Sequence, residues 1–495
     1  MPAASVLPGI ALLPAALAIL LIVLARRRPA LREACSVFAA VAQTAVVAAL
    51  LPSVLAGAAP TWRPFELAPS IPLELRADAL GTLFALVASA LWVATTIYSI
   101  GYTRAENEQR LTRYFASFAL CLWSTVGIAF AGNLLTFYFF YEVLTVAGYP
   151  LVIHRQTPEA RRAGRVYLLY TLGGGVALLA AVAWTYFLAG TTDFVAGGIG
   201  GLAHASGSVL WGVFVLFVIG CGVKAAVVPL HTWLPVAMVA PTPVSALLHA
   251  VAVVKAGVFG FARVTGFVFG PELLHDIGAA TVLAWMAAAT IVLASVGALV
   301  QDDLKRLLAF STIGQLSYIV LGVALGTPAA FAGGVMHLAS HAVLKITLFF
   351  CAGAIAATAH VDRVSQLTGV GRRMPLTLGA FAAAAFMLAG LPPGVAFVSK
   401  WRLLSGAVEA GSWVGAGALL ASAVLTIGYF APIVVRAFAP APPGTPGEVR
   451  EASPAMLVPL LCTAAAGLAL GLVPDAGAHL LSLATAAATA VTGSR

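Results

Sequence analysis

Charged residues are scarce in this sequence. Asp, Glu, Lys and Arg make up only 9% of its 495 residues, whereas soluble domains carry roughly 25%. Hydrophobic residues account for 61%, and apolar runs of about 20 residues, long enough to cross a bilayer core, recur from end to end. A soluble globular protein is therefore excluded. Continuous runs also exclude a transmembrane β-barrel, whose strands alternate, so we predict an all-α polytopic membrane protein without a sizeable soluble domain.

The sequence also lacks the usual motifs for redox centres and nucleotides. Its five cysteines lie in apolar runs without a C-x-x-C spacing, which is typical of small buried residues. No G-x-G-x-x-G opens a strand–helix unit, so a nucleotide site is not predicted. No cluster of carboxylates and carbonyl-type ligands indicates a metal cage. We therefore expect no cofactor and no bound metal.

The first apolar run has neither a basic n-region nor a small-residue cleavage site, so we expect it to be retained rather than removed as a signal peptide. Fourteen transmembrane helices are predicted, at residues 4–25, 32–56, 78–102, 113–131, 133–153, 164–189, 208–228, 242–262, 276–299, 306–325, 328–356, 375–404 (interrupted), 412–436 and 455–473.

The positive charges indicate the orientation. Eighteen Lys and Arg residues fall in one set of alternate loops, whereas the other side has four, namely Arg63, Arg76, Arg263 and Arg495. Because cytoplasmic loops collect Lys and Arg, we predict a bacterial cytoplasmic (inner) membrane protein with both termini on the outer side. The net charge of +9 is then explained by topology and by contact with the lipid bilayer, and no nucleic-acid partner is needed.

A few charges remain inside the predicted helices. Among the basic residues these are Lys224, Lys255, Lys345, Lys400 and Arg402; among the acids, Glu142 sits at the centre of a span. A charge at mid-bilayer costs roughly 2.5–3.5 kcal/mol, so such residues normally face the bundle interior and have a function. Arg402 is closer to an interface and could snorkel. For Glu142 we expect a cationic partner from another helix.

One helix carries three titratable groups on a single face. His337, His341 and Lys345 are spaced i, i+4, i+8, which places them on one stripe about 12 Å long. A lone buried histidine is usually a satisfied core residue, but three stacked groups indicate a proton relay. Histidine titrates near neutral pH. His249 precedes Lys255 and extends this line, although its spacing is not same-face.

Prolines interrupt two helices next to these lysines. Pro229 and Pro235 follow Lys224, and Pro392 and Pro393 precede Lys400. Helices broken near an intramembrane charge are typical of transporter sites, and their mirrored order is compatible with inverted repeats. The predicted tenth helix adds polar side chains that could hold water, namely Ser311, Thr312, Gln315, Ser317 and Tyr318.

Four stretches, KAAVVPLHTWLPVAMVAPTPVSALLHA, QDDLKRLLAFSTIGQLSYI, HLASHAVLK and LPPGVAFVSK, resemble the proton-conducting antiporter-like family. This family includes the antiporter-like subunits of complex I, the A and D subunits of Mrp-type Na+/H+ antiporters, and membrane-bound hydrogenase subunits. The resemblance implies two inverted five-helix repeats, helices 4–8 and 9–13, each with one broken helix. The implied division is residues 1–110, 111–265 (first repeat), 270–437 (second repeat) and 438–495.

The resemblance also assigns site residues. Glu142 matches the family's helix-five glutamate and Lys224 its helix-seven lysine partner, and Lys255 matches the central lysine. His341 and Lys345 match the helix-eleven positions, and Lys400 matches the lysine at the outer exit. It implies a proton-translocating subunit of a multi-subunit complex, with other membrane subunits as partners and Na+ exchange left open. The short C-terminal part and Lys255 favour a D-type subunit.

Two other readings stand beside this one. A membrane enzyme acting on a quinone or lipid would need catalytic carboxylates or a metal in the loops, where acids are few and scattered. A structural anchor for redox subunits would have no reason to keep charges inside the membrane. We expect no oxidoreductase activity from the chain alone.

Overall fold

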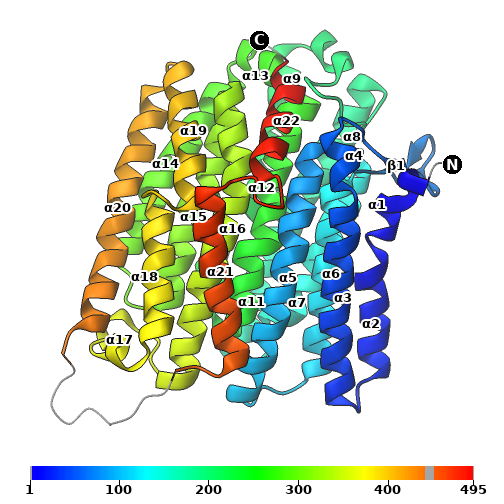
Figure 1. Ribbon diagram of the computed structural model, residues 1–495. Helices are drawn as coiled ribbons and strands as arrows, with labels where there is room; N and C mark the ends of the chain where they lie inside the picture. The colour runs from blue at the N-terminus through cyan, green and yellow to red at the C-terminus, as the bar shows by residue number, and fades with distance from the viewer. Residues whose placement is uncertain (1–2, 441–450, 494–495) are drawn as a thin grey trace.

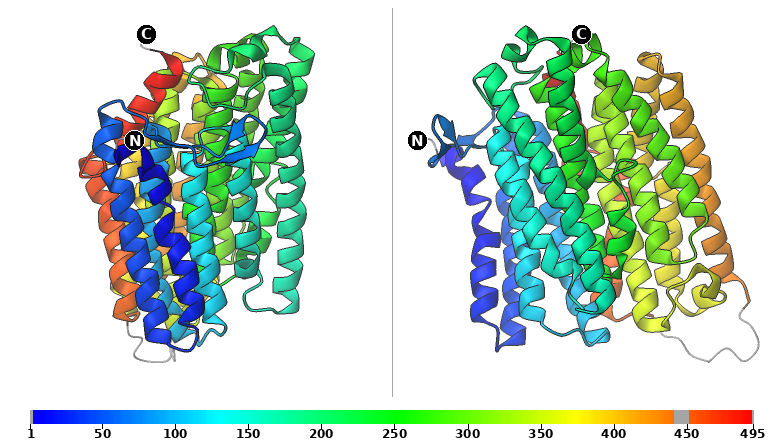
Figure 2. Two further views of the ribbon diagram at one scale, coloured as in Figure 1. Left: turned by 90° about the vertical axis from the view of Figure 1, so that its right-hand side faces the viewer. Right: turned by 180° about the vertical axis from the view of Figure 1, so that it is seen from behind.

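The computed structural model describes residues 3–440 and 451–493, and its long elements are all helices. Figure 1 and the side and rear views of Figure 2 show roughly parallel helices in an elongated bundle, with α2 and α3 at one end and α20 at the other. The helices are η1 (Ala3–Val6), α1 (Leu7–Ile10), α2 (Leu13–Leu24), α3 (Pro29–Ala49), α4 (Leu51–Leu55), α5 (Ala79–Ala105), α6 (Leu111–Phe130), α7 (Leu134–Val152), α8 (Pro158–Ala189), η2 (Gly200–His204), α9 (Gly207–Ala225), α10 (Trp233–Val236), η3 (Ala237–Val239), α11 (Thr242–Ala246), η4 (Leu247–Val251), α12 (Val253–Arg263), η5 (Val264–Val268), α13 (Pro271–Asp276), α14 (Ala279–Leu299), α15 (Leu304–Leu325), α16 (Pro328–Ala359), η6 (Val364–Gln366), α17 (Val370–Arg373), α18 (Pro375–Ala389), α19 (Val395–Glu409), α20 (Trp413–Phe438), α21 (Pro454–Leu472) and α22 (Leu480–Thr492).

The number of membrane crossings agrees with the prediction. Within the described residues, 13 helices are long and apolar enough to cross a membrane. The predicted twelfth crossing is the pair α18 and α19, separated by a turn at Gly390–Gly394. The predicted seventh crossing ends at Ala225, directly after Lys224, and continues as a turn and the short helix α10. Both breaks lie where the prolines predicted them.

Matching caps begin the helices that carry the site. Thr157 and Thr327 each precede a proline and accept a hydrogen bond from the backbone amide three residues later, at 3.2 and 3.3 Å. They open α8 and α16, which are both 32 residues long. Asn133 and Asp303 cap α7 and α15 in the same way, both at 2.8 Å. Such caps satisfy amides that the first helical turn leaves free.

The predicted eighth helix is longer and less regular than expected. It extends from Thr242 to Val268 and contains two π-helical segments, η4 and η5. Arg263 was predicted to lie in an outer loop, and this was wrong, because it lies inside the helix with 1% of its surface exposed. Its guanidinium is neutralised by Asp78 Oδ2 at 2.5 Å, so the helix continues past the charge.

Two features of the upper face were not predicted. Helix α22 follows α21 and continues toward the upper face, where the described chain also begins (Figure 1). Between α4 and α5 the chain forms two antiparallel two-stranded ribbons, which pair β1 (Thr61–Trp62) with β4 (Leu75–Arg76) and β2 (Glu66–Ala68) with β3 (Ile71–Pro72). These strands are too short to produce a periodic signal in the sequence.

Candidate functional site

Most of the predicted site residues are completely buried. Six have no exposed surface, namely Lys224, His249, Lys255, His337, His341 and Lys345. Glu142 and Lys400 are partly buried. The six come from only three stretches of chain, α9, the irregular helix from α11 to η5, and α16. Buried polar groups require partners, and these partners define how the site is built.

Lys255 and His341 bring the two halves of the chain together. Lys255 Nζ of α12 lies 2.7 Å from Nδ1 of His341 in α16. A contact this short between two nitrogens needs a hydrogen on one and a free lone pair on the other. The pair can therefore share one extra proton, and the two groups cannot both be fully protonated while the contact persists. His341 Nε2 is buried and has no hydrogen-bond partner among the described residues.

His337, one turn before His341, is held by two further helices. Its Nε2 lies 3.1 Å from Gln315 Oε1 in α15, and its Nδ1 lies 2.9 Å from Ser399 Oγ in α19. The Ser399 hydroxyl also lies 3.1 Å from the carbonyl oxygen of Ala396. Because a hydroxyl can rotate, Ser399 can donate its hydrogen to His337 Nδ1. Alternatively, it can donate this hydrogen to the Ala396 carbonyl and accept a hydrogen bond from His337 Nδ1. His337 can thus gain a proton without losing either contact.

Lys345 is bound by hydroxyl groups. Its Nζ donates to Ser311 Oγ at 2.8 Å, and that hydroxyl lies 2.9 Å from the Tyr429 hydroxyl of α20. Tyr429 in turn donates to Thr426 Oγ1 at 3.2 Å. A chain of rotatable hydroxyls therefore leads away from Lys345 toward α20.

Lys400 occupies the break between α18 and α19. Its Nζ donates to the carbonyl oxygens of Leu388 and Ala389 at 2.8 and 3.3 Å, and it lies 4.7 Å from the centre of the Tyr318 ring. The last carbonyls of a helix have no partner within it and carry the negative end of its dipole. Breaking the helix therefore creates the acceptors that hold this ammonium group.

Lys224 and Glu142 are neighbours but do not form a direct ion pair among the described contacts. Lys224 Nζ donates to the carbonyl oxygen of Tyr141 at 2.5 Å and lies 3.4 Å from the centre of its ring. The carboxylate of Glu142 occupies the space that a side chain at Gly175 would fill, and its Oε1 has no hydrogen-bond partner within the described part of the chain. The contact that forms is to the residue preceding Glu142.

His249 is the least connected of the eight residues. In residues 3–440 and 451–493 neither ring nitrogen finds a hydrogen-bond partner, and the ring centre lies 5.0 Å from that of Phe349. It lies in η4, where the wider π-helical turn interrupts the helix just before Lys255. Such turns are frequent at functional sites. No proline or glycine lies within η4 to signal this irregularity.

An additional ion pair was missed by sequence reasoning. Arg263 donates to both carboxylate oxygens of Asp78 at 2.5 and 3.0 Å, and its guanidinium lies 4.8 to 5.1 Å from the rings of Phe194, Phe259 and Phe267. Burial raises the pKa of Asp78, but the charge and hydrogen bonds of Arg263 outweigh burial, so the pKa lies below its ordinary value. The pair fixes the helix of Lys255 to the start of α5.

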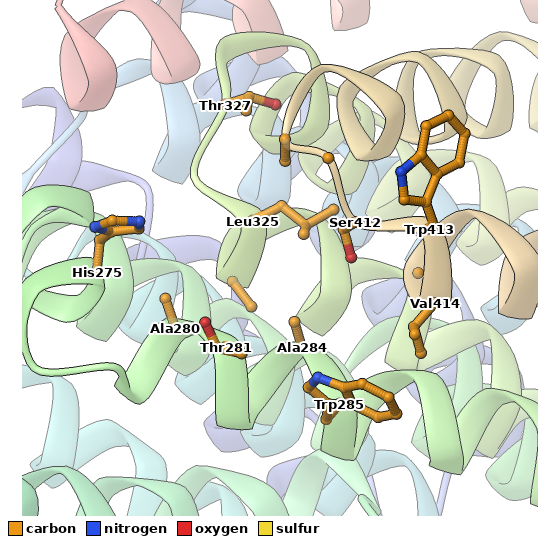
Figure 3. A pocket seen from close by; sticks show the side chains of 14 residues that line it. His275, Ala280, Thr281, Ala284, Trp285, Leu325, Thr327, Ser412, Trp413 and Val414 are labelled. Carbon is orange, nitrogen blue, oxygen red and sulfur yellow. The ribbon is translucent and has the colours of Figure 1, made fainter.

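A separate pocket of about 570 Å³ opens near the upper end of α14 and α15 (Figure 3). His275, Thr281 and Trp285 line one side, and Ser412 and Trp413 face them from the turn between α19 and α20. None of the eight predicted site residues lines this pocket. It is therefore not part of the buried polar network.

The chain is similar to known membrane proteins in sequence and in fold. Residues 131–426 match the family described as NADH:quinone oxidoreductase/Mrp antiporter, TM. The chain is 35% identical to NADH-quinone oxidoreductase subunit N of Desulforudis audaxviator, over 81% of this chain and 82% of that protein. It is 32% identical to subunit L of Mycobacterium tuberculosis, over 77% of this chain and 60% of that protein.

A putative antiporter subunit, mnhA2 of Staphylococcus haemolyticus, is 32% identical over 79% of this chain and 50% of its own length. The chain thus spans only part of these longer relatives.

Two solved structures share the fold at 24% identity. A chain of the Mrp complex from Dietzia sp. has a TM-score of 0.89 and covers 100% of this chain and 98% of its own. A chain of an archaeal membrane-bound sulfane sulfur reductase has a TM-score of 0.85 and covers 99% and 97%.

Proposed function

This chain belongs to the NADH:quinone oxidoreductase/Mrp antiporter family, and we propose that it translocates protons as one membrane subunit of a multi-subunit complex. The proton path consists of Glu142, Lys224, Lys255, Lys345 and Lys400, with His249, His337 and His341 in supporting positions. Its relatives are subunits of NADH-quinone oxidoreductases and of cation/proton antiporters, which supports this assignment.

The observation that carries the proposal is the 2.7 Å contact between Lys255 and His341. Both side chains are fully buried, and an intramembrane ionisable residue is by default functional. A purely structural pair would be expected to neutralise its charge with a carboxylate. Here two bases share one hydrogen bond, which is suited to passing a proton between helices.

Close helix packing supports a continuation toward Lys224. A side chain at Gly257 of α12 would overlap the backbone of α9 at Lys224 and Ala225. The glycine therefore lets the helix of Lys255 touch the helix of Lys224. A proton crossing between the two lysines still needs an intermediate such as water, since their amines are bonded to different groups.

We further propose the division into two inverted repeats, residues 111–265 and 270–437. The caps support it, because Asn133 and Asp303 open the second helix of each repeat and Thr157 and Thr327 open the third. By the distribution of Lys and Arg, the lower face in Figure 1 lies in the cytoplasm of a bacterial inner membrane and both termini lie outside. Within the family, an Mrp-type D subunit is our proposed assignment.

Proton uptake by vesicles containing the whole complex tests the function. Lys255→Ala removes the shared hydrogen bond and should abolish uptake. Lys255→Arg keeps a positive charge but cannot release its proton, because the pKa of arginine exceeds about 12, so it should also fail while assembling better. Rates are normalised to assembled protein. Native uptake by Lys255→Arg would mean that the lysine acts only as a fixed charge and would refute the relay.

A further inference from the structure

A second pocket, of about 670 Å³, lies at the lower end of the bundle where α7 leads into α8. It is lined by Tyr149, Gln156, Pro158, Arg161 and Arg165. Arg161 and Arg165 are one turn apart, so their side chains share a face of α8. Both are exposed, and within the described residues neither guanidinium has an ion-pair or hydrogen-bond partner. The pocket therefore presents two free guanidinium groups, a phenol and an amide.

An exposed apolar stripe continues from this pocket along α8. Leu169, Leu172 and Val176 follow Arg165 at helical spacing on the same face, and 75%, 44% and 71% of their surfaces are exposed. A second stripe runs along α7 from Tyr149 through Val146, which is 61% exposed. The basic pocket and the two apolar stripes thus follow one another along the membrane normal.

Two glycines of α8 bring these stripes together. A methyl group at Gly164 would lie 2.9 Å from the Tyr149 ring, so glycine allows this ring to pack at the edge of the pocket. Three turns further, Gly175 leaves the space that the Glu142 carboxylate occupies. The apolar stripes therefore extend from the basic pocket to the partly exposed Glu142.

We propose that this pocket binds the phosphate of an anionic phospholipid, whose acyl chains lie on the two stripes and cover the edge of the groove at Glu142. Arginine binds phosphate with two parallel hydrogen bonds, and basic pockets between transmembrane helices on the cytoplasmic side bind lipid headgroups. The positive-inside bias explains why arginines lie on this face, but not why two of them share a pocket with Tyr149 and Gln156. Free phosphate would leave the stripes unused. The choice of leaflet rests on the proposed orientation.

The chain provides a matched control for the test. Arg162 lies between the two pocket arginines and is exposed, but it does not line the pocket. Phosphatidylglycerol is titrated into the purified whole complex, and the lipid-bound fraction is measured by native mass spectrometry. Binding should weaken about five-fold for each pocket arginine changed, as in Arg161→Gln and Arg165→Gln, in line with the typical contribution of one basic residue near an anionic lipid surface. Arg162→Gln should bind like the native complex.

Several results would overturn the proposal. If Arg162→Gln weakens phosphatidylglycerol binding as much as the two pocket variants do, the surface attracts lipid only by its overall positive charge. Equal retention of phosphatidylcholine would remove the preference for an anionic lipid, and displacement by inorganic phosphate alone would remove the role of the acyl chains. Cross-linking of residue 161 to a neighbouring subunit, with no lipid retained, would assign the pocket to a protein contact instead.

Discussion

At the scale of single residues, the four lysines of the candidate site are bound by neutral groups. Among the described contacts none forms an ion pair with a carboxylate. The Lys224 amine binds a backbone carbonyl and the Lys255 amine binds an imidazole. The Lys345 amine binds a hydroxyl, and the Lys400 amine binds two carbonyls at the end of a helix. A carboxylate partner would stabilise the charged amine, and breaking such a pair is costly. Neutral partners hold each amine in place while allowing its proton to leave.

Lys224 is the first of these lysines in the sequence, and Glu142 supplies the carboxylate nearest to it. Changing Glu142→Gln keeps the shape against Gly175 but removes the negative charge. Transport should slow by about two orders of magnitude, the lower range for removal of a positioned proton-transfer group, while assembly stays intact. Proton uptake by vesicles of the whole complex measures the effect.

The same substitution at Glu159 is the control for this prediction, because Glu159 is an exposed carboxylate at the start of α8. Glu159→Gln should transport at the native rate. If Glu142→Gln does as well, the carboxylate is not a station of the path. If both variants are slow, the effect comes from the general loss of negative charge on this side.

The titratable residues of the site could be read from the sequence because a charge inside an apolar run stands out. Their partners could not. Ser399 and Tyr429 are ordinary polar residues in their helices, and only packing brings them to His337 and, through Ser311, to Lys345. The expected partnership of Glu142 with Lys224, direct or through one water, shows the same limit. The sequence indicates the depth of both charges in the membrane, but not that the Lys224 amine donates to the Tyr141 carbonyl.

At the scale of elements, irregular helices position the charged groups. The break after Ala389 exposes the carbonyls that bind Lys400, and the π-helical η4 precedes Lys255. Prolines made the first kind of irregularity predictable. The second kind has no residue signature here, and the neutralising pair of Arg263 with Asp78 extended a helix that the sequence suggested would end.

The Asp78–Arg263 pair permits a sharp test, because asparagine caps a helix as well as aspartate does. Asp78→Asn should keep the hydrogen bond from the Gly81 amide, now 2.8 Å long, but leave Arg263 buried without a counter-charge. We expect a loss of about 3 kcal/mol in stability, measured by thermal unfolding of the purified complex in detergent. Asp303→Asn is the control, since Asp303 caps α15 at 2.8 Å without an ion pair among the described residues.

The acid dependence of stability follows from the same pair. The pKa of Asp78 is lowered by folding from its ordinary value of 3.8, so the unfolded chain takes up this proton first as the pH falls. The charge of Asp78 therefore makes its full contribution to the free energy of unfolding above about pH 4. This contribution is lost as the pH drops through the pKa of Asp78 in the folded protein. Comparing native protein with Asp78→Asn, the stability difference should shrink below pH 4; a difference that stays constant would show that the charge is not its source.

At the scale of the whole molecule, two clusters of buried polar side chains lie next to each other where α9 contacts α12. One surrounds Lys224, and the other extends from Lys255 through α16 to the hydroxyls of α20. The number of crossings and the family were accessible from hydropathy and motifs, whereas this contact between the helices of Lys224 and Lys255 required Gly257 to be placed against α9 in three dimensions.

The proposed proton path would be driven by a reaction outside the chain. The sequence contains no nucleotide-binding motif and no C-x-x-C spacing among its cysteines. The titratable groups of the candidate site are Glu, Lys and His side chains, which exchange protons but not electrons. The purified chain alone should therefore oxidise no NADH and reduce no quinone, whereas any such turnover should follow the soluble partners of the intact complex. Spectrophotometric assays of the isolated chain and of the complex, prepared in the same detergent, make the comparison. Electron transfer by the isolated chain would reveal a redox site in it and would place the driving reaction within this subunit.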